Sequence, residues 1–513
     1  MTEPDILALG FASIPDLVHA HALRAPMRPA LSQEAHRLNY AELDIAMDRV
    51  AASLQRDGLA AGECIAVCAA DSLDYVVIFL GALRAGIVVA PLSAAATAVT
   101  LSAMIADCGA RLLFVDAAAA ASLASVRDRI GARRVGLDAA SLAAWLAPAG
   151  SVPQPVAPRP DWPFNIIYSS GTTGTPKGIV QPWAMRWGHV QRFGTWLAGT
   201  QTVMLIATPL YSNTTLVSLL PTLAVGGSVV LMGRFDAPAY LALAERQRVT
   251  HTMLVPVQYQ RIMAAAEFSR YDLSAFHLKF CTSAPFPAVL KADVLSRWPG
   301  GVLELYGMTE GGVSCLLAAH EFPGKLHTVG RPAPGCDIRL IDDSDRELGP
   351  GATGEVVGRS AAMMRGYHGL PQQSADMEWY DAAGRRYLRS GDIGRFDADG
   401  FLILLDRKKD LIISGGFNIY PSDLEAELAQ HEDVADCAVV GVASRRWGET
   451  PVAFVVLREG AHLEAESLRT WVNARVGKTQ RLAALNIVAS LPRSAIGKVL
   501  KRELRDGYAA PLD

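Results

Sequence analysis

Residues 166–178 of the chain are Ile-Ile-Tyr-Ser-Ser-Gly-Thr-Thr-Gly-Thr-Pro-Lys-Gly, a short apolar run followed at once by a loop of small and hydroxylated residues. The apolar run predicts the last residues of a buried strand. Glycines let the backbone approach an anion closely, and hydroxyls and free N–H groups can surround phosphate oxygens. We therefore predict a phosphate-binding loop that consists of Ser169, Ser170, Gly171, Thr172, Thr173, Gly174 and Lys177.

Two other interpretations of this loop are weaker. A Walker A loop requires Gly-Lys-Ser/Thr, whereas here Pro176 precedes the lysine and Gly178 follows it, so the P-loop NTPase class is excluded. An ordinary turn rich in Ser, Thr and Gly is disfavoured because ten residues of this composition directly follow a buried strand. The lysine also supplies the point charge that a polyphosphate would need.

The residues before the loop alternate between helical and strand patterns. Apolar residues recur at helical spacing over 40–54, whereas 64–69 and 112–115 have the composition of buried strands. Such alternation predicts α/β layers with largely parallel strands. The prolines of 147–163 exclude regular structure there, so we interpret that stretch as a connector inside the domain.

The pattern changes in the last third of the chain. From about 330 to 405, short strand patterns are separated by Gly, Pro and Asp turns, which predicts a small β-rich subdomain. The charged stretch 406–410 follows, and a compact α+β pattern begins after it. The fold class is therefore α/β, with a large N-terminal domain at 1–405 and a small α+β C-terminal domain at 406–513.

Composition and charge are typical of a soluble globular protein with more than one domain. The 513 residues are too many for one hydrophobic core, half of them are hydrophobic, and 19% are charged. A net charge of −3 gives no basic surface for nucleic acid. The longest apolar stretch, 75–99, is interrupted by Arg84, so we expect no transmembrane segment. The sequence sets no oligomeric state, and a homodimer is one state that it allows.

The cysteines and the first residues indicate a compartment. Seven cysteines are scattered along the chain without a pairing pattern, which is typical of reduced, mostly buried thiols. Residues 1–10 contain Glu3 and Asp5 and lack the positively charged start of a signal peptide. We therefore expect a cytoplasmic protein.

The phosphate loop resembles the signature of the adenylate-forming superfamily, which contains acyl-CoA synthetases, adenylation domains of peptide synthetases and luciferases. Further motifs of that family follow in order. They are Leu-Tyr-Gly-Met-Thr-Glu at 305–310, Arg-Ser-Gly-Asp at 389–392, Asp-Arg-Lys-Lys-Asp at 406–410 and Leu-Pro-Arg-Ser-Ala-Ile-Gly-Lys-Val-Leu at 491–500. The resemblance is closest to fatty-acyl or aryl-CoA ligases. It implies an ATP-dependent, AMP-forming enzyme that adenylates a carboxylic acid and then forms its coenzyme A thioester.

The resemblance also assigns the nucleotide site. It implies that Tyr306 stacks on the adenine, Thr309 contacts the α-phosphate and Glu310 holds Mg²⁺. A cation at that point would neutralise the charge that develops on the phosphate. Asp392 would accept hydrogen bonds from the ribose hydroxyls, and Arg407 would lie near the ribose. The remaining residues expected at the nucleotide are Gly307, Ser283, Ala284 and Pro285, with Thr282 and Ser283 standing where the family usually has two glycines.

The same resemblance implies that the C-terminal domain is mobile and carries the catalytic Lys498. A flexible ammonium on a mobile domain can bridge the acid's carboxylate and the α-phosphate when the site closes. Lys409 would be the hinge whose backbone absorbs the domain rotation. For coenzyme A, Gly415 and Gly416 would line the pantetheine tunnel, and Trp447 would lie near the CoA.

The acid pocket is also inferred by resemblance. The family's pocket wall would correspond to Tyr211, Ser212, Asn213, Leu305, Gly312 and Val313. Residues 209–215 contain no acidic side chain, so an amino acid, whose ammonium would be buried unpaired, is disfavoured as a substrate. The small Gly312 and Val313 favour a pocket for an aryl or an extended aliphatic acid.

The helix expected after the phosphate loop is assigned to the core. Trp183, Trp187 and Val190 are spaced at i, i+4 and i+7 and share one helical face, which is more typical of core than of a substrate wall. Arg186 and Arg192 could pair with a second carboxylate of the acid. Exposure of both arginines to solvent is the plainer expectation.

Three other functions are compatible with these motifs. A freestanding ligase that loads a carrier protein would use the same attack by a pantetheine thiol. A luciferase-like oxygenase shares every motif, although adenylation followed by thioester formation is the commoner outcome in the family. A nucleotide-binding protein without catalysis is disfavoured by the intact Lys177, Thr309, Glu310, Asp392, Arg407 and Lys498.

Overall fold

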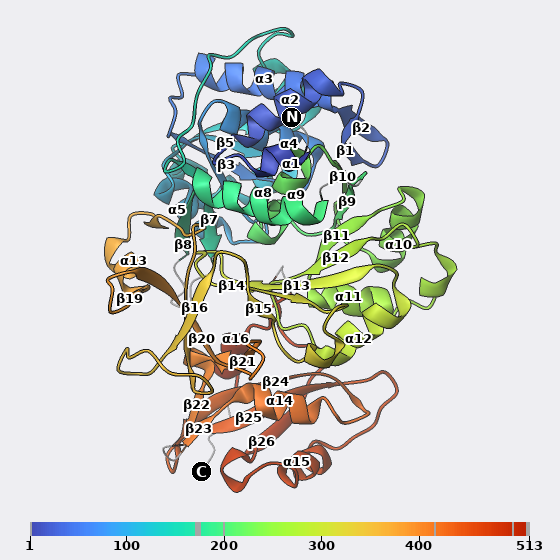
Figure 1. Ribbon diagram of the computed structural model, residues 1–513, viewed down its shortest axis with the longest axis vertical. Coiled ribbons are helices and arrows are strands. Elements are labelled where there is room, and N and C mark those ends of the chain that lie inside the picture. Colours follow the sequence, from blue (N-terminus) through green and yellow to red (C-terminus); the bar gives the residue numbers. More distant parts are fainter. Residues whose placement is uncertain (1–2, 170–175, 198–200, 415–416, 495–496, 509–513) are drawn as a thin grey trace. The chain divides into compact units, whose positions relative to one another are not determined.

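The computed structural model describes residues 3–169, 176–197, 201–414, 417–494 and 497–508 (Figure 1). The chain divides into two compact units. The first contains Met1–Leu326, Pro332–Asp337 and Arg359–Leu388, and the second contains His327–Arg331, Ile338–Gly358 and Arg389–Asp513.

The phosphate loop emerges from a seven-stranded sheet of the first unit, in the order β18-β8-β7-β4-β3-β5-β6. Neighbouring strands from β7 to β6 are parallel, whereas β8 and β18 are antiparallel additions at one edge. The strands are β3 (Cys64–Cys68), β4 (Val88–Pro91), β5 (Ala110–Val115), β6 (Arg133–Gly136), β7 (Pro163–Ser169), β8 (Lys177–Pro182) and β18 (Gly366–Tyr367). The buried strands predicted at 64–69 and 112–115 are therefore confirmed as β3 and β5.

A second, larger sheet of this unit carries the other nucleotide motifs. The strands of this sheet that lie wholly in the first unit follow the order β14-β13-β12-β11-β9-β10-β1-β2 and are parallel from β13 to β1. The hairpins β13–β14 and β1–β2 are antiparallel. The strands are β1 (Pro29–Gln33), β2 (His36–Asn39), β9 (Val203–Ile206), β10 (Ser228–Leu231), β11 (His251–Leu254), β12 (Leu278–Cys281), β13 (Gly301–Gly307) and β14 (Ser314–Ala318).

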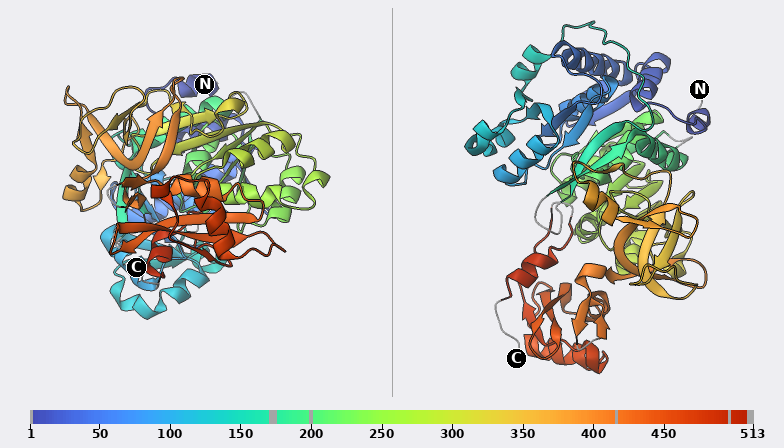
Figure 2. Two further views of the ribbon diagram at one scale, coloured as in Figure 1. Left: turned by 90° about the horizontal axis from the view of Figure 1, so that it is seen from below. Right: turned by 90° about the vertical axis from the view of Figure 1, so that its left-hand side faces the viewer.

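Helices pack on both sheets and between them (Figures 1 and 2). One hydrophobic core joins residues of β3 and β9 to residues of α3, α4, α8 and α9. It includes Trp183, Trp187 and Val190, so the predicted core face of α8 is confirmed. The helices of this unit are α1 (Glu3–Leu7), α2 (Ile14–Arg24), α3 (Tyr40–Arg56), α4 (Leu73–Arg84), α5 (Ala98–Asp107), α6 (Ala117–Ser122), α7 (Ala139–Trp145), α8 (Trp183–Leu197), α9 (Asn213–Ala224), α10 (Ala237–Arg246), α11 (Pro256–Met263), α12 (Ala288–Arg297) and α13 (Pro371–Asp376).

Local sequence explains where the predicted helix at 40–54 begins. The Asn39 side chain accepts a hydrogen bond from the Glu42 N–H, and the Glu42 carboxylate accepts one from the Asn39 N–H, each at 2.9 Å. This reciprocal pair satisfies two N–H groups that the first turn leaves without a helical partner. The apolar positions of α3 then face α4 and α2.

The second unit contains one sheet from the residues before 408 and a second sheet from the C-terminal part of the chain. Strands β16 (Asp337–Ile341), β17 (Thr353–Arg359), β20 (Arg386–Phe396) and β21 (Leu402–Arg407) are neighbours in one sheet. A second sheet has the order β23-β22-β25-β24, with β26 beside β25. It contains β22 (Ile412–Ser414), β23 (Phe417–Ile419), β24 (Val434–Ser444), β25 (Gly448–Leu457) and β26 (Ala484–Ile487), with helices α14 (Pro421–Leu428), α15 (Ala465–Asn473) and α16 (Lys501–Asp506).

The two units are groups of residues in contact, and their limits are not the same as the predicted domain boundary after residue 405. This grouping does not test that boundary. Contacts group Ile338–Gly358 and the residues from Arg389 onward with the C-terminal part. The boundary after residue 405, and the mobility of the part beyond it, stay predictions. Within the described ranges, no helix is both long and apolar enough to cross a membrane.

Candidate active site

The two ends of the phosphate loop are fixed by a hairpin. Ser169 is the last residue of β7 and pairs with Lys177, the first residue of β8. The Lys177 ammonium lies 5.1 Å from the centre of the Tyr367 ring, a cation–π arrangement. The predicted residues between these ends, Ser170, Gly171, Thr172, Thr173 and Gly174, lie outside the described residues.

The turn between β13 and β14 holds Thr309 and Glu310. The Gln181 amide nitrogen donates to the Thr309 carbonyl at 2.7 Å, and the Met364 N–H donates to the Glu310 carbonyl at 2.7 Å. The Tyr367 hydroxyl donates to the Glu310 carboxylate at 2.9 Å. The backbone and the carboxylate of this turn are therefore held from β8 and from the segment that contains β18.

Glycines are required directly after Glu310. Gly311 and Gly312 have φ of +78° and +80°, a region that L side chains rarely adopt. A Cβ on Gly311 would lie 2.0 Å from the Ala362 carbonyl oxygen, and the Gly312 N–H donates to that same oxygen at 3.0 Å. The close approach of these two backbone segments fixes the turn. The positive φ of Gly312 is a second reason for glycine at this position, besides the pocket size expected from the sequence.

The loop after β12 has a non-glycine residue in the left-handed region. Ser283 has φ +80°, the conformation that glycine adopts without strain. Its hydroxyl is 2.5 Å from the Thr214 hydroxyl, and the Thr282 hydroxyl donates to the Leu305 carbonyl at 2.7 Å. Ser283 thus has a glycine-like backbone, and the hydroxyls of Ser283 and Thr282 add hydrogen bonds to α9 and β13. Ala284 and Pro285 follow in the same loop.

The start of α9 contains the residues expected in the acid pocket. The Ser212 side chain caps the helix by accepting from the Thr214 N–H at 3.2 Å. The side-chain oxygen of Asn213 accepts from the Gln181 amide at 3.3 Å, and burial raises the pKa of the Tyr211 phenol. Leu305 and Val313 lie on β13 and in the turn after it. Gln181, which contacts both Asn213 and the Thr309 carbonyl, connects the acid residues with the phosphate residues.

Arg186 is buried, so the expectation that it is exposed is wrong. Its side chain is 1% exposed, and its guanidinium donates to the Asn165 and Gln181 side-chain oxygens. Burial lowers the pKa of Arg186 to about 9. These two partners come from β7 and β8, which flank the phosphate loop. The guanidinium also lies 3.5 Å from Nδ1 of His189 on the same helix, and no carboxylate pairs with it among the described residues. Arg192 is half-buried and donates to the Ser314 hydroxyl at 3.0 Å.

In the second unit, the two residues expected at the ribose, Asp392 and Arg407, form an ion pair. Arg407 Nε lies 2.7 Å from an Asp392 carboxylate oxygen, and the two residues are cross-strand partners in β20 and β21. The Asp392 side chain is mostly buried, whereas that of Arg407 is 47% exposed. Lys409 lies in a 3-10 turn, Lys408–Asp410, which directly follows β21. The neighbouring Lys408 pairs with Glu355 at 3.1 Å.

The residues expected at the thiol and at the reacting carboxylate also belong to this unit. Lys498 is exposed, and its backbone closes a small hairpin because the Ser494 N–H donates to the Lys498 carbonyl at 2.8 Å. Trp447 is 47% exposed, and the Arg446 guanidinium lies 4.7 Å from its ring centre. Gly448 pairs with Ser414, while the predicted Gly415 and Gly416 lie outside the described residues.

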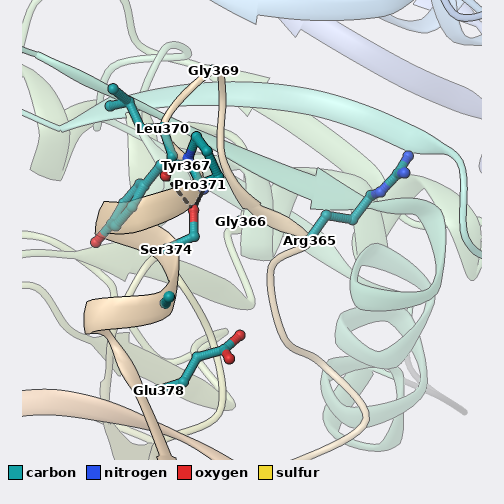
Figure 3. A pocket seen from close by; sticks show the side chains of 9 residues that line it. Arg365, Gly366, Tyr367, Gly369, Leu370, Pro371, Ser374 and Glu378 are labelled. Atoms are coloured by element: carbon teal, nitrogen blue, oxygen red, sulfur yellow. Dashed lines mark hydrogen bonds between the residues drawn. The ribbon is translucent and has the colours of Figure 1, made fainter.

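Tyr367 and Gln181 are residues at this site that sequence reasoning missed. The Tyr367 backbone N–H donates to the Ser374 hydroxyl at 2.8 Å beside a cavity of about 450 Å³ (Figure 3). That cavity contains none of the residues expected to bind ATP or the acid, so we assign it no ligand. The available signal was the two-residue run Gly366–Tyr367, and such a run is too short to indicate a site.

A buried ion pair supports the strand that carries Tyr306. Lys291 on α12 pairs with Glu304 on β13, both less than 5% exposed, and burial raises the pKa of Glu304 to about 7. We expect Glu304→Gln to lower the free energy of unfolding by about 3–5 kcal/mol, because it leaves a buried ammonium without its anion. The double variant Lys291→Met/Glu304→Leu removes both charges and should recover most of the loss. Urea denaturation followed by fluorescence measures this, and equal losses in the single and double variants would contradict it.

Comparisons with known proteins identify the family of this chain. A family model described as AMP-binding enzyme matches residues 18–368, and one described as AMP-binding enzyme C-terminal domain matches residues 423–498. Indoleacetate–CoA ligase from Aromatoleum aromaticum is 32% identical, covering 95% of this chain and 96% of the relative. Feruloyl-CoA synthase from an Amycolatopsis species is 33% identical (94% and 97% covered), and the fatty acid–[acyl-carrier-protein] ligase ScoC from Streptomyces coeruleorubidus is 31% identical (95% of each covered).

A solved structure gives the same result for the fold. ATP-bound MatB from Rhodopseudomonas palustris has a TM-score of 0.88 and 28% identity, covering 97% of this chain and 98% of that one. The predicted fold class, a large α/β domain followed by a smaller C-terminal domain, is thereby confirmed. The chain belongs to the AMP-binding enzyme family and is an AMP-forming acid–CoA ligase that uses ATP and coenzyme A.

Proposed function

We propose that the acid activated by this ligase is an aryl or arylalkanoic acid, with a fatty acid as the second choice. The observation that supports this most is that every side chain expected in the acid pocket is neutral: Tyr211, Ser212, Asn213, Leu305, Gly312 and Val313. A neutral pocket suits the uncharged body of such an acid and gives no partner for a substrate ammonium. Relatives named for indoleacetate and ferulate support the aryl class.

We propose that the residues at the two loops of the first unit bind the ATP phosphates. Lys177 would supply a positive charge to the polyphosphate, and Thr309 would contact the α-phosphate. Glu310 fits a magnesium ligand because one carboxylate oxygen accepts from Tyr367, and among the described residues no donor contacts the other. Bound Mg²⁺ would offset the negative charge of the phosphates. Tyr306 and the loop of Ser283, Ala284 and Pro285 would then enclose the adenine beside Gly307.

We propose that some residues of the second unit serve adenylation and that others serve thioester formation. Asp392 would accept from the ribose hydroxyls, with Arg407 beside it, and Lys498 would stabilise the acid's carboxylate and the α-phosphate during adenylation. Lys409 would serve as the hinge. In the thioester step, Gly415, Gly416 and Trp447 would serve the coenzyme A. The seven cysteines, unpaired in the described residues, support a cytoplasmic location.

A screen of acids for pyrophosphate release tests the proposed substrate class. Indole-3-acetate, ferulate and 4-coumarate should give kcat/KM at least about tenfold above those of hexanoate and decanoate, a difference of about 1.4 kcal/mol in transition-state stabilisation. Phenylalanine is a matched control because it adds an ammonium to an arylalkanoic acid and should be inactive. Higher values for the two fatty acids would replace the aryl class with the fatty class.

A carrier protein is the alternative acceptor of the acyl group, and a separate measurement tests it. A phosphopantetheine-bearing carrier protein presents the same thiol as coenzyme A, and one relative is named for such loading. Thioester formation from a fixed concentration of acyl-adenylate should be faster with free coenzyme A than with a holo carrier protein at equal thiol concentration. The reverse order would indicate that a carrier protein is the physiological acceptor.

A further inference from the structure

Tyr367 is a buried tyrosine whose backbone is fixed on three sides. It lies in β18, where it pairs with Ile179 of β8, and its N–H donates to the Ser374 hydroxyl at 2.8 Å (Figure 3). The next residue, His368, donates its N–H to the Gly178 carbonyl at 2.7 Å. The side chain is therefore attached to a rigid backbone beside the hairpin that follows the phosphate loop, and the residue is 8% exposed.

The side chain of Tyr367 contacts two residues that are far apart in sequence and belong to different motifs. Its hydroxyl donates to a carboxylate oxygen of Glu310 at 2.9 Å. Its ring lies under the Lys177 ammonium, 5.1 Å from the ring centre. All three residues belong to the first unit. Tyr367 is thus a contact shared by the lysine at the end of the phosphate loop and the carboxylate of the β13–β14 turn.

We propose that Tyr367 is a positioning residue for adenylation, with its hydroxyl orienting Glu310 toward the metal and its ring orienting Lys177 toward the polyphosphate. The proposal rests on the roles of Glu310 and Lys177 in the proposed function. A hydrogen bond to an ionised carboxylate is stronger than a neutral one, and groups that orient a metal ligand affect metal affinity strongly. The ring holds the ammonium without neutralising it, because a cation–π contact involves no opposite charge.

The two contacts can be separated by substitution. Tyr367→Phe keeps the ring beneath Lys177 and removes only the donor to Glu310. Tyr367→Leu removes both contacts. Tyr387→Phe is a matched control because Tyr387 is also buried and its hydroxyl donates to a carboxylate, that of Asp337, at 2.5 Å. That control removes a similar hydrogen bond from residues to which we assign no role with ATP.

Calorimetric titration of ATP, with MgCl₂ and with EDTA, measures the gain in ATP affinity that the metal provides. We expect Tyr367→Phe to reduce this gain about tenfold and to raise the Mg²⁺ concentration for half-maximal pyrophosphate exchange by a similar factor. Tyr367→Leu should in addition weaken ATP binding in EDTA, because Lys177 loses its support. Tyr387→Phe should lower the melting temperature and leave both magnesium readouts unchanged. A purely structural role for Tyr367 would make Tyr367→Phe behave like Tyr387→Phe, and that result would overturn the proposal.

A further variant separates failure of this inference from failure of the proposed function. Glu310→Gln removes the anionic ligand and should abolish most of the magnesium-dependent gain. If Glu310→Gln lowers the gain while Tyr367→Phe does not, the metal role of Glu310 stands and the positioning role of Tyr367 is wrong. If Glu310→Gln leaves the gain intact, the metal is held elsewhere, and both assignments are wrong.

Discussion

Replacing Lys498 with alanine is expected to lower acyl-adenylate formation by about 10²–10³-fold, while thioester formation from supplied acyl-adenylate stays largely intact. The reason is that an ammonium at the acid's carboxylate and the α-phosphate stabilises charge only during the first half-reaction. The Lys498 side chain is exposed on a small hairpin, so its removal leaves no cavity in the core. Pyrophosphate exchange measures the first half-reaction, and release of AMP with thioester formation from the supplied adenylate measures the second.

A matched control for this prediction is available four residues further along the chain. Arg502 is an exposed cation on α16 that forms an ion pair with Asp506 at 3.3 Å, an interaction that contributes at most about 1 kcal/mol to stability. Arg502→Ala should leave both half-reactions near the level of the unchanged protein. Pyrophosphate exchange by Lys498→Ala at a rate close to that of Arg502→Ala would remove Lys498 from the catalytic residues.

Local patterns predicted the elements that surround the site. The helix at 40–54 is α3, and the buried strands at 64–69 and 112–115 are β3 and β5. Helical and strand periodicities depend on which side of each element is buried, and this information is contained within a few neighbouring residues. The phosphate loop was recognisable for the same reason, because its composition and its strand are contiguous.

Contacts made by sheet pairing could not be predicted in the same way. Tyr367 belongs to a two-residue strand, which is too short for a periodic pattern, and it reaches Glu310 across 57 residues of sequence. Arg186 was expected to be exposed because an arginine rarely lies in a core without a carboxylate partner. Its partners, Asn165 and Gln181, are brought to it by the pairing of β7 with β8. Such contacts can be identified only when the order of the strands in the sheet is known.

A similar limit applies to Ser283. By the resemblance, Thr282 and Ser283 stand where the family usually has two glycines. The structure gives Ser283 a glycine-like φ of +80° and a hydroxyl contact with Thr214 on α9. A left-handed conformation costs a non-glycine residue about 1–2 kcal/mol, and the hydroxyl contact offsets part of that cost. A tertiary contact therefore supports the left-handed conformation at a residue that is not glycine.

Replacing Lys409 with proline is expected to separate the two half-reactions. Lys409 lies in the 3-10 turn Lys408–Asp410 between β21 and β22, and the Leu411 N–H closes this turn on the Arg407 carbonyl at 3.1 Å. Proline fixes φ near −65° and so removes the rotation that a hinge at this residue requires. In the proposed function, adenylation would need Lys498, and the thioester step would need Gly415 and Gly416. We propose that one orientation of the C-terminal domain cannot serve both steps.

The expected result is therefore an unequal loss. We propose that bound ATP favours the adenylation orientation, so thioester formation from supplied acyl-adenylate should fall at least about tenfold more than pyrophosphate exchange. Lys409→Ala is the matched control: it removes the same ammonium but leaves φ free, so any effect it has should reach both half-reactions alike. Equal loss of both activities in Lys409→Pro, together with a lower melting temperature, would indicate misfolding. Retention of both activities would move the hinge to another residue of 406–410, since rotation must be absorbed by a backbone torsion that the proline does not restrict.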